Sequence, residues 1–217
     1  MPTSSNRSKG LGQILVEKNI ISQRQLDAAL EHQQTRKGKY LGQILFEMGV
    51  SQTKINTILD QCNKRKPLGQ VLVDLKILSP QELDELLENQ RKLQETMDRQ
   101  PLGVLLVDLG YTTYEKYLEA LSKHFNMPIV SLEDFIPHPS QQKPIGEKYA
   151  KKNRIIVLEN DEIKVKIALA EPTQSLIEEV QRIFKGIQSV EFYLAYPLKV
   201  EACLKRLFDP FAVNQFR

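Results

Sequence analysis

The sequence of 217 residues is 41% hydrophobic, which is enough for one large or two small hydrophobic cores. Its 30 basic and 27 acidic residues give a net charge of +3 and are spread along the chain, so no basic block indicates a nucleic-acid or membrane-surface binder. No segment approaches the roughly 20 apolar residues that span a bilayer, and the polar N-terminus does not resemble a signal peptide. Since Cys62 and Cys203 are the two cysteines, no disulfide framework is expected, and we expect a cytoplasmic protein.

A five-residue block follows the polar residues 1–9, which we expect to be disordered. The block occurs four times: Leu11-Gly12-Gln13-Ile14-Leu15, Leu41-Gly42-Gln43-Ile44-Leu45, Leu68-Gly69-Gln70-Val71-Leu72 and Leu102-Gly103-Val104-Leu105-Leu106. Three residues separate each copy from a position that can close a short helix, namely Asn19, Gly49, Lys76 or Gly110. Each block is therefore expected to form a short helix that ends at this break.

A second helix is predicted after each break. Its start is marked by residues suited to an N-cap, three of them with capping-box spacing: Ser22 with Gln25, Ser79 with Glu82, Thr112 with Glu115, and Ser51 as a plain cap. Apolar residues at helical spacing predict one buried stripe per helix: Leu26-Ala29-Leu30, Ile55-Ile58-Leu59, Leu83-Leu86-Leu87 and Leu118-Leu121. The resulting hairpins, near 10–33, 40–62, 67–90 and 101–124, are expected to pack into a helical bundle over residues 10–130.

The four hairpins fall into two alternating types. The first and third end in Gln33 and Gln90, whereas the second and fourth have a glycine at the break and end in Cys62 and His124. This alternation suggests a duplicated pair of hairpins, with the charged segment 89–100 joining the third and fourth copies.

From residue 131 to residue 210 the pattern changes to mixed helices and strands. We expect a helix around 145–152, a strand at 154–158, a turn at 159–162 and an alternating strand at 163–169, which together indicate a β-hairpin. A helix opened by Thr173 or Ser175, a third strand at 190–196 and a final helix at 197–208 follow, before a tail at 211–217. The predicted fold class is α+β, in which the helical bundle precedes a small three-stranded sheet with helices on one face.

The repeats and the α/β segment together resemble the MshEN, or GspE N-terminal, family, which is the N-terminal region of type II secretion and type IV pilus assembly ATPases. The family repeat reads Arg-Leu-Gly, two residues, Leu, three residues, Gly, six residues, Leu, three residues, Leu, two residues, Gln. The first copy matches it at Leu11, Gly12, Leu15, Leu26, Leu30 and Gln33, and the third at Leu68, Gly69, Leu72, Leu83, Leu87 and Gln90. The motif arginine is absent from all four copies, where Gly10, Tyr40, Pro67 and Pro101 stand in its place.

The family's ATPases continue into a catalytic domain with a Gly-x-x-x-x-Gly-Lys-Ser/Thr loop that binds phosphate, and no segment of this sequence fits that pattern. The sequence also shows no spacing that indicates a metal site and no nucleophile with a neighbouring base. We therefore expect a regulatory protein with no catalytic residue, no metal and no cofactor.

The resemblance implies that the repeats bind cyclic di-GMP. A helix that begins at Leu-Gly presents unpaired backbone N–H groups, and its glycine lets a phosphate approach closely. Lys9, Lys39 and Lys66 each lie two positions before a Leu-Gly, where a cation can assist, and Gln33 and Gln90 can hydrogen-bond a guanine edge. The candidate ligand-binding residues are Lys9, Gly10, Leu11, Gly12, Leu15, Leu26, Leu30, Gln33, Lys39, Leu41, Gly42, Leu45, Lys66, Leu68, Gly69, Leu72, Leu87, Gln90, Leu102, Gly103 and Leu106.

Two other interpretations stay open. Leu-Gly-x-x-Leu is also a good way to pack two short helices, so the chain can be a protein–protein scaffold that has lost nucleotide binding. The basic passages 36–39 and 64–66 raise a nucleic-acid hypothesis, but no helix carries a row of recognition residues. The expected partners are secretion or pilus assembly proteins, including an assembly ATPase, with the α/β domain as the candidate contact surface; neither nucleic acid nor membrane insertion is expected.

Overall fold

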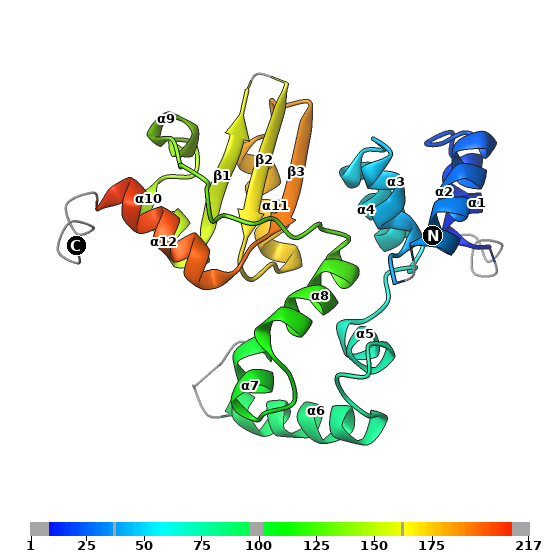
Figure 1. Ribbon diagram of the computed structural model, residues 1–217, viewed down its shortest axis with the longest axis horizontal. Coiled ribbons are helices and arrows are strands. Elements are labelled where there is room, and N and C mark those ends of the chain that lie inside the picture. The colour runs from blue at the N-terminus through cyan, green and yellow to red at the C-terminus, as the bar shows by residue number, and fades with distance from the viewer. Residues whose placement is uncertain (1–8, 37, 96–101, 162, 210–217) are drawn as a thin grey trace.

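The computed structural model describes residues 9–36, 38–95, 102–161 and 163–209, except for the side chains of residues 90–95 and 104. The expected disordered N-terminus, apart from Lys9, and the tail at 211–217 lie outside these residues. Helices α1 to α8 form two groups, and a three-stranded sheet with its helices lies at the opposite end from α1 to α4 (Figure 1). None of the helices in the described part of the chain is both long and apolar enough to cross a membrane.

Each Leu-Gly block begins a short helix, and a longer helix follows it. The first helices are α1 (Leu11–Glu17), α3 (Leu41–Glu47), α5 (Leu68–Asp74) and α7 (Leu102–Asp108), and the second are α2 (Gln23–Thr35), α4 (Gln52–Gln61), α6 (Pro80–Glu95) and α8 (Tyr114–Phe125). The predicted breaks all have a left-handed backbone, with φ values of 54° at Asn19, 87° at Gly49, 55° at Lys76 and 76° at Gly110. The four predicted helical hairpins are therefore confirmed.

The predicted starts of the second helices are confirmed in three hairpins and wrong in the fourth. Ser22 and Ser79 each form the expected capping box, and the Ser51 hydroxyl accepts from the backbone N–H of Lys54. In the fourth hairpin the N-cap is Thr113, whose side chain makes no capping hydrogen bond, and the Thr112 hydroxyl donates to the carbonyl oxygen of Thr113. Helix α6 also runs to Glu95, so most of the segment that was expected to join the third and fourth copies is helical.

The predicted buried stripes are wrong at their outer ends. Leu30 and Leu87, which occupy the same position in the first and third hairpins, are 42% and 46% exposed. Leu26, Ala29 and Leu86, on the same second helices, are buried in the contact with the first helix of the hairpin. That first helix is only seven residues long, so it does not cover the last turn of the second helix, where Leu30 and Leu87 lie.

Lys76 occupies a backbone conformation that favours glycine, and we expect Lys76→Gly to stabilise the protein. An L-residue in this region costs about 1 kcal/mol that glycine avoids. The exposed Lys76 side chain has little packing to lose, so the free energy of unfolding in urea should rise by about 1 kcal/mol. Gly49→Ala at the equivalent break is the control: no atom lies within 4 Å of the added Cβ, so only the backbone effect remains, and stability should fall. A loss of stability in Lys76→Gly would contradict this explanation.

The α/β part contains α9 (Pro139–Gln142), α10 (Glu147–Asn153), β1 (Ile155–Asn160), β2 (Lys164–Leu169), α11 (Gln174–Ile183), β3 (Ser189–Leu194) and α12 (Pro197–Phe208). The strand order is β1-β2-β3; β1 pairs antiparallel with β2, and β2 pairs parallel with β3 through the crossover helix α11. The expected turn is shorter than predicted, because β1 continues to Asn160 and the Asp161 carboxylate accepts from two backbone N–H groups directly beyond it. The predicted α+β fold is confirmed.

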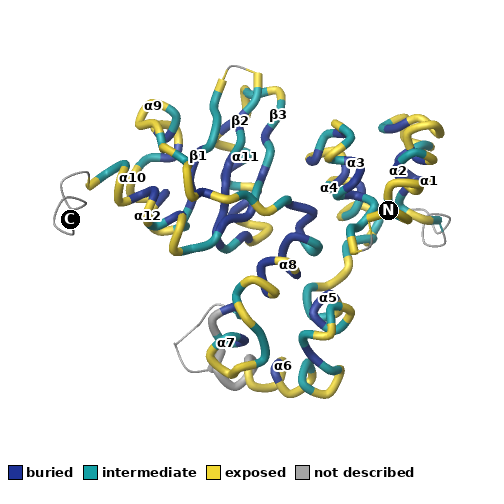
Figure 2. Tube along the Cα trace, in the orientation of Figure 1, coloured by how far each residue is buried: buried dark blue, intermediate teal, exposed yellow. Residues whose placement is uncertain are grey.

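Buried apolar residues form two separate clusters. Figure 2 marks the buried residues along the chain. The N-terminal cluster contains residues between Ile14 and Ile58, all from the first two hairpins. The larger cluster runs from Val71 to Leu204, and so joins the third and fourth hairpins to the α/β part. The boundary expected near residue 130 stays a prediction, since apolar packing is continuous across it.

Hydrogen bonds to the outer edge of β3 connect the two clusters. Gln52, which is 2% exposed, donates from Nε2 to the carbonyl oxygens of Phe192 at 2.9 Å and Asn126 at 3.1 Å, and its Oε1 accepts from the Phe192 N–H at 2.8 Å. Two residues further on, Leu194 exchanges backbone hydrogen bonds with the segment 128–130. The edge of the sheet is thus satisfied by a side-chain amide from α4 and a stretch of extended backbone.

Candidate functional site

A cavity of about 340 Å³ lies where the first two hairpins meet α8, and we call it the Gly42 cavity. Its lining comes from α1, α3 and α4, from the linker that follows α4, and from the end of α8. The lining residues are Leu11, Tyr40, Leu41, Gly42, Leu59, Lys64, Arg65, Lys66, Lys123, His124 and Asn126. Both core clusters therefore contribute to this site.

The Gly42 cavity is cationic. Lys64, Arg65, Lys66 and Lys123 line it, and its described lining contains no Asp or Glu. The carboxylates that pair with three of these cations belong to residues outside the lining: Asp60 with Arg65 at 2.6 Å, Glu119 with Lys123 at 3.3 Å, and Asp74 with Lys66. A cavity with this distribution of charge suits an anion, since the paired carboxylates hold the cations in place without occupying the space.

Tyr40 places an aromatic ring in the cavity, at the position where the family repeat has its arginine. The Nζ atoms of Lys66 and Lys123 lie 5.9 Å and 5.7 Å from the ring centroid, within the range of cation–π contacts. Burial raises the pKa of the Tyr40 hydroxyl, so the ring stays neutral at physiological pH. An aromatic face next to two ammonium groups is a suitable surface for a purine that carries phosphate nearby.

Arg65 and His124 fix the linker against the end of α8. The Arg65 guanidinium donates to the His124 carbonyl oxygen at 2.7 Å and pairs with the Asp60 carboxylate. The His124 Nδ1 lies 2.8 Å from the Lys66 carbonyl oxygen; because a carbonyl can only accept, Nδ1 carries the hydrogen. Burial lowers the pKa of His124, which leaves the ring neutral at pH 7.

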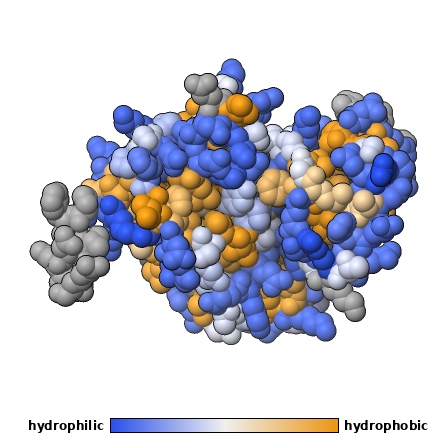
Figure 3. Space-filling model, turned by 45° about the horizontal axis from the view of Figure 1, so that its top comes forward, coloured by the Kyte–Doolittle hydropathy of each residue, from blue (hydrophilic) through white to orange (hydrophobic). Residues whose placement is uncertain are grey.

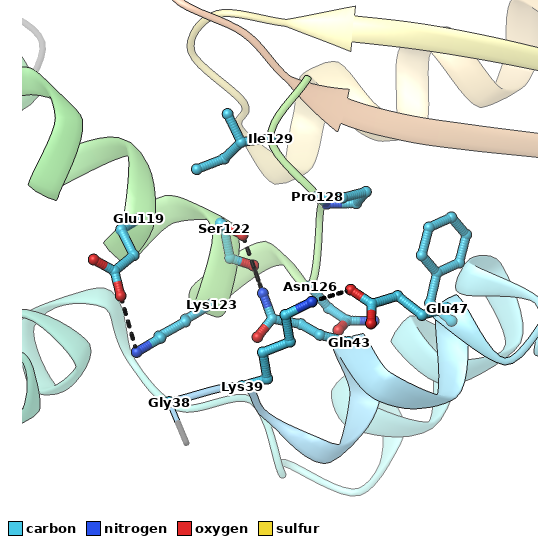
Figure 4. A pocket seen from close by; sticks show the side chains of 11 residues that line it. Gly38, Lys39, Gln43, Glu47, Glu119, Ser122, Lys123, Asn126, Pro128 and Ile129 are labelled. Atoms are coloured by element: carbon cyan, nitrogen blue, oxygen red, sulfur yellow. Dashed lines mark hydrogen bonds and ion pairs between the residues drawn. The ribbon is translucent and has the colours of Figure 1, made fainter. Parts of the chain in front are cut away.

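A second cavity, of about 370 Å³, also has Asn126 in its lining, and we call it the Gln43 cavity (Figure 4). Its lining contains both positively and negatively charged side chains, because Lys39 pairs with Glu47 and Lys123 pairs with Glu119. Across it the Gln43 Nε2 donates to the Ser122 hydroxyl at 3.0 Å, which ties α3 to α8. With its cations paired to carboxylates inside the lining, it is a poorer anion site than the Gly42 cavity.

The structure brings together four of the predicted binding residues, Leu11, Leu41, Gly42 and Lys66, in the Gly42 cavity. Lys39 lines the Gln43 cavity instead, and Leu102 and Gly103 line a third cavity next to Arg154 and Glu171. The other described leucines are not lining residues of these cavities: Leu15, Leu26, Leu45, Leu72 and Leu106 are buried in the cores, Leu68 is half-buried, and Leu30 and Leu87 are exposed.

The predicted lysines share a structural contact. Lys9, Lys39 and Lys66 each pair with the carboxylate eight residues later, Glu17, Glu47 and Asp74, at the end of the first helix. Gln33 donates to the Lys39 carbonyl oxygen at 3.0 Å and so closes the connection between the first two hairpins. Gly10 is the exposed N-cap of α1, and the side chain of Gln90 lies outside the described part.

Three of the four Leu-Gly glycines are covered by the second helix of their own hairpin. A Cβ on Gly12, Gly69 or Gly103 would lie 2.3, 2.9 and 2.2 Å from the side chains of Leu26, Leu83 and Tyr117, respectively. Gly42 differs, because its neighbour is Asn126, the residue that follows α8, whose Oδ1 would lie 3.0 Å from an added Cβ. At three positions glycine therefore serves helix packing, and at Gly42 it faces the cavity.

Sequence reasoning missed most of the residues that give the Gly42 cavity its chemistry, namely Tyr40, Leu59, Lys64, Arg65, Lys123, His124 and Asn126. Tyr40 had a signal, since it replaces the motif arginine. The basic linker 64–66 had one too, but it was interpreted as a weak sign of nucleic-acid binding. Lys123, His124 and Asn126 had none, because their distance to Gly42 depends on how α8 packs against the second hairpin.

Comparisons with known proteins agree with this fold. Residues 125–213 match the sequence model of the MshEN domain. The C-terminal part of the chain is thus similar to the MshEN domain. The match begins at Phe125, at the end of the fourth hairpin, so the matched segment consists mainly of the α/β part and leaves the repeats outside it. No curated protein matches the sequence.

Two solved structures are similar to the chain. A structure of MshE with cdg, an abbreviation for cyclic di-GMP, covers 66% of this chain and 100% of that chain, at 23% identity and a TM-score of 0.57. A structure of the N-terminal domain of XpsE covers 64% of this chain and 93% of that chain, at 14% identity and a TM-score of 0.41. The likeness to MshE shows a shared fold that extends beyond the segment matched by the MshEN sequence model, since it covers about two thirds of the chain.

Proposed function

We propose that this chain is a non-catalytic regulatory or adaptor protein that binds cyclic di-GMP in the Gly42 cavity. The observation that carries the proposal is the convergence of four cations and a tyrosine ring on a cavity whose described lining has no carboxylate. The cations suit two phosphates, and Tyr40 and the leucines offer apolar surface to a purine. The MshEN domain and the shared fold with MshE, which was solved with this ligand, support the choice of cyclic di-GMP.

Lys66→Gln tests the proposal in an isothermal titration with cyclic di-GMP. Removal of one cation from the cavity should weaken binding about tenfold, the effect of one charge-assisted hydrogen bond. Lys9→Gln is the matched control, because Lys9 stands at the same repeat position, pairs with Glu17 at 2.5 Å and does not line the cavity. Equal affinity of the two variants would place the ligand elsewhere, and no heat with the unmodified protein would contradict cyclic di-GMP binding; GTP and cyclic di-AMP serve as competitors.

The alternative function is a protein–protein scaffold of the same fold. Its support is the coverage of Gly12, Gly69 and Gly103 by side chains of their own hairpins, which gives the glycine of three of the four Leu-Gly motifs a role in helix packing. In either case we propose that the protein acts in the cytoplasm on a secretion or pilus assembly protein, such as an assembly ATPase.

The α/β part offers a candidate contact surface for that partner. Ile136 and Leu198 are 81% and 78% exposed, which is unusual for large apolar side chains. Figure 3 shows hydrophobic patches on the side of the molecule that contains the sheet, separated by hydrophilic residues from those on the N-terminal helices. We propose that a partner which binds the ligand-bound form of the protein contacts this surface of the α/β part, away from the Gly42 cavity.

A further inference from the structure

Asn126 is a buried residue whose side chain has no hydrogen-bond partner. It is 3% exposed, and among the described residues neither its Oδ1 nor its Nδ2 has a partner. The backbone around it is well held: its carbonyl oxygen accepts from Gln52, and the N–H of Met127 donates to Ser122. A buried amide without a partner is costly, since it gives up its hydrogen bonds to water.

The end of helix α8 explains the backbone of Asn126 but not its side chain. Asn126 follows α8 with φ 54° and ψ 46°, a left-handed conformation that asparagine tolerates and glycine prefers. Asn19 and Asn63 have the same conformation, with φ values of 54° and 51°, and both are exposed, so water can satisfy their amides. If position 126 only had to end the helix, glycine would suit it better than asparagine.

The amide lies where a ligand in the Gly42 cavity could reach it. Asn126 belongs to the lining of the Gly42 cavity and of the Gln43 cavity, and its Oδ1 faces Gly42. A side chain at position 42 would occupy this contact, and glycine leaves it open. The Nζ groups of Lys66 and Lys123 lie on the same cavity, beside the ring of Tyr40. Cationic groups, an aromatic ring and an amide thus line the same cavity.

We propose that Asn126 hydrogen-bonds the edge of a purine base of the bound cyclic dinucleotide and contributes to its specificity. This inference rests on the proposed function. An amide carries one donor and one acceptor group side by side, which match O6 and N1–H of guanine, or N1 and the exocyclic amine of adenine if the amide rotates. A change in the side-chain torsions of Asn126 turns the amide from Gly42 into the cavity, where the base takes the place of its missing partners.

The test compares Asn126→Gly with Asn19→Gly, each titrated with cyclic di-GMP and melted without ligand. Both substitutions place glycine in a left-handed position, but only the first removes an amide from the cavity. Asn126→Gly should bind cyclic di-GMP about tenfold more weakly, as expected for one lost hydrogen bond, while its melting temperature stays equal or rises. Asn19→Gly should leave the affinity unchanged.

Asn126→Asp adds a second measurement, the selectivity between two cyclic dinucleotides, which would not change if Asn126 had only a structural role. A carboxylate accepts from both N1–H and the 2-amino group of guanine but repels the N1 lone pair of adenine, so the affinity ratio of cyclic di-GMP to cyclic di-AMP should increase. An unchanged affinity in Asn126→Gly, or a clear fall in its melting temperature, overturns the assignment of Asn126 while the proposed function stands. If the unmodified protein binds neither nucleotide, both proposals fail.

Discussion

Gln52→Ala should destabilise the protein by about 3 kcal/mol, because three buried backbone groups lose their partner at once. The Gln52 amide satisfies the N–H and carbonyl of Phe192 and the carbonyl of Asn126, and alanine can replace none of these hydrogen bonds. Each buried polar group that is left without a partner costs about 1–3 kcal/mol, reduced where water enters the space left by the side chain. Urea unfolding followed by circular dichroism measures the change.

Gln61→Ala is the control for this prediction, since Gln61 ends the same helix and is exposed. Its effect should stay within about 0.5 kcal/mol of zero. Because Gln52 connects the two core clusters, Gln52→Ala should also separate the unfolding of the first two hairpins from that of the rest. A change below about 0.5 kcal/mol with a single transition would show that the clusters are held together by other contacts.

Gly103→Ala should destabilise the fourth hairpin by about 2 kcal/mol through overpacking. An added Cβ would lie 2.2 Å from Cε1 and 2.7 Å from Cδ1 of Tyr117, a ring that is 6% exposed and has little room to move. The gain in helix propensity from glycine to alanine, about 1 kcal/mol, offsets only part of this strain. The melting temperature of the variant reports the net effect.

Gly10→Ala provides the comparison, because no atom lies within 4 Å of a Cβ added there. It should change the melting temperature little. If the clash with Tyr117 is the cause, Tyr117→Leu in the Gly103→Ala background should recover part of the loss, since leucine is smaller than the ring. Equal stability of Gly103→Ala and the unmodified protein would show that α7 and α8 can separate without cost.

The sequence predicted local structure well because its signals are local. The Leu-Gly blocks, the breaks at Asn19 and Lys76 and the caps at Ser22 and Ser79 each depend on residues a few positions apart, and the structure has the helices where they place them. The wrong prediction of the N-cap in the fourth hairpin also concerns adjacent residues. Thr112 and Thr113 are equally suited to an N-cap, so residue type alone does not decide between them.

The candidate site was harder to predict because it is made by contacts between distant segments. Tyr40, Arg65 and Asn126 meet only because α4 docks on the edge of β3 and α8 ends beside Gly42. Periodicity also treats the four Leu-Gly glycines alike, although three face a side chain of their own hairpin and Gly42 faces Asn126, which lies outside its hairpin. That difference depends on which residue lies opposite, and no repeat pattern contains it.

The same docking links the two stability predictions to binding. The lining of the Gly42 cavity comes from both core clusters, since Leu11 and Leu41 pack on the N-terminal cluster and α8 belongs to the other. Gln52→Ala loosens this junction, so it should weaken ligand binding as well as lower the stability of the fold. Gly103→Ala acts at a different cavity and should leave binding intact at temperatures where the protein is folded.

Hydrogen–deuterium exchange with and without cyclic di-GMP tests most directly whether the ligand occupies the Gly42 cavity. Peptides that cover residues 40–46, 59–66 and 122–127 contain nearly all of its lining, and we expect their amides to exchange more slowly when the ligand is bound. Peptides at 102–106 and 171–176, which line the cavity at Gly103, should be unaffected. Protection confined to the Gly103 cavity, or none at saturating ligand, would contradict the site proposed for this protein.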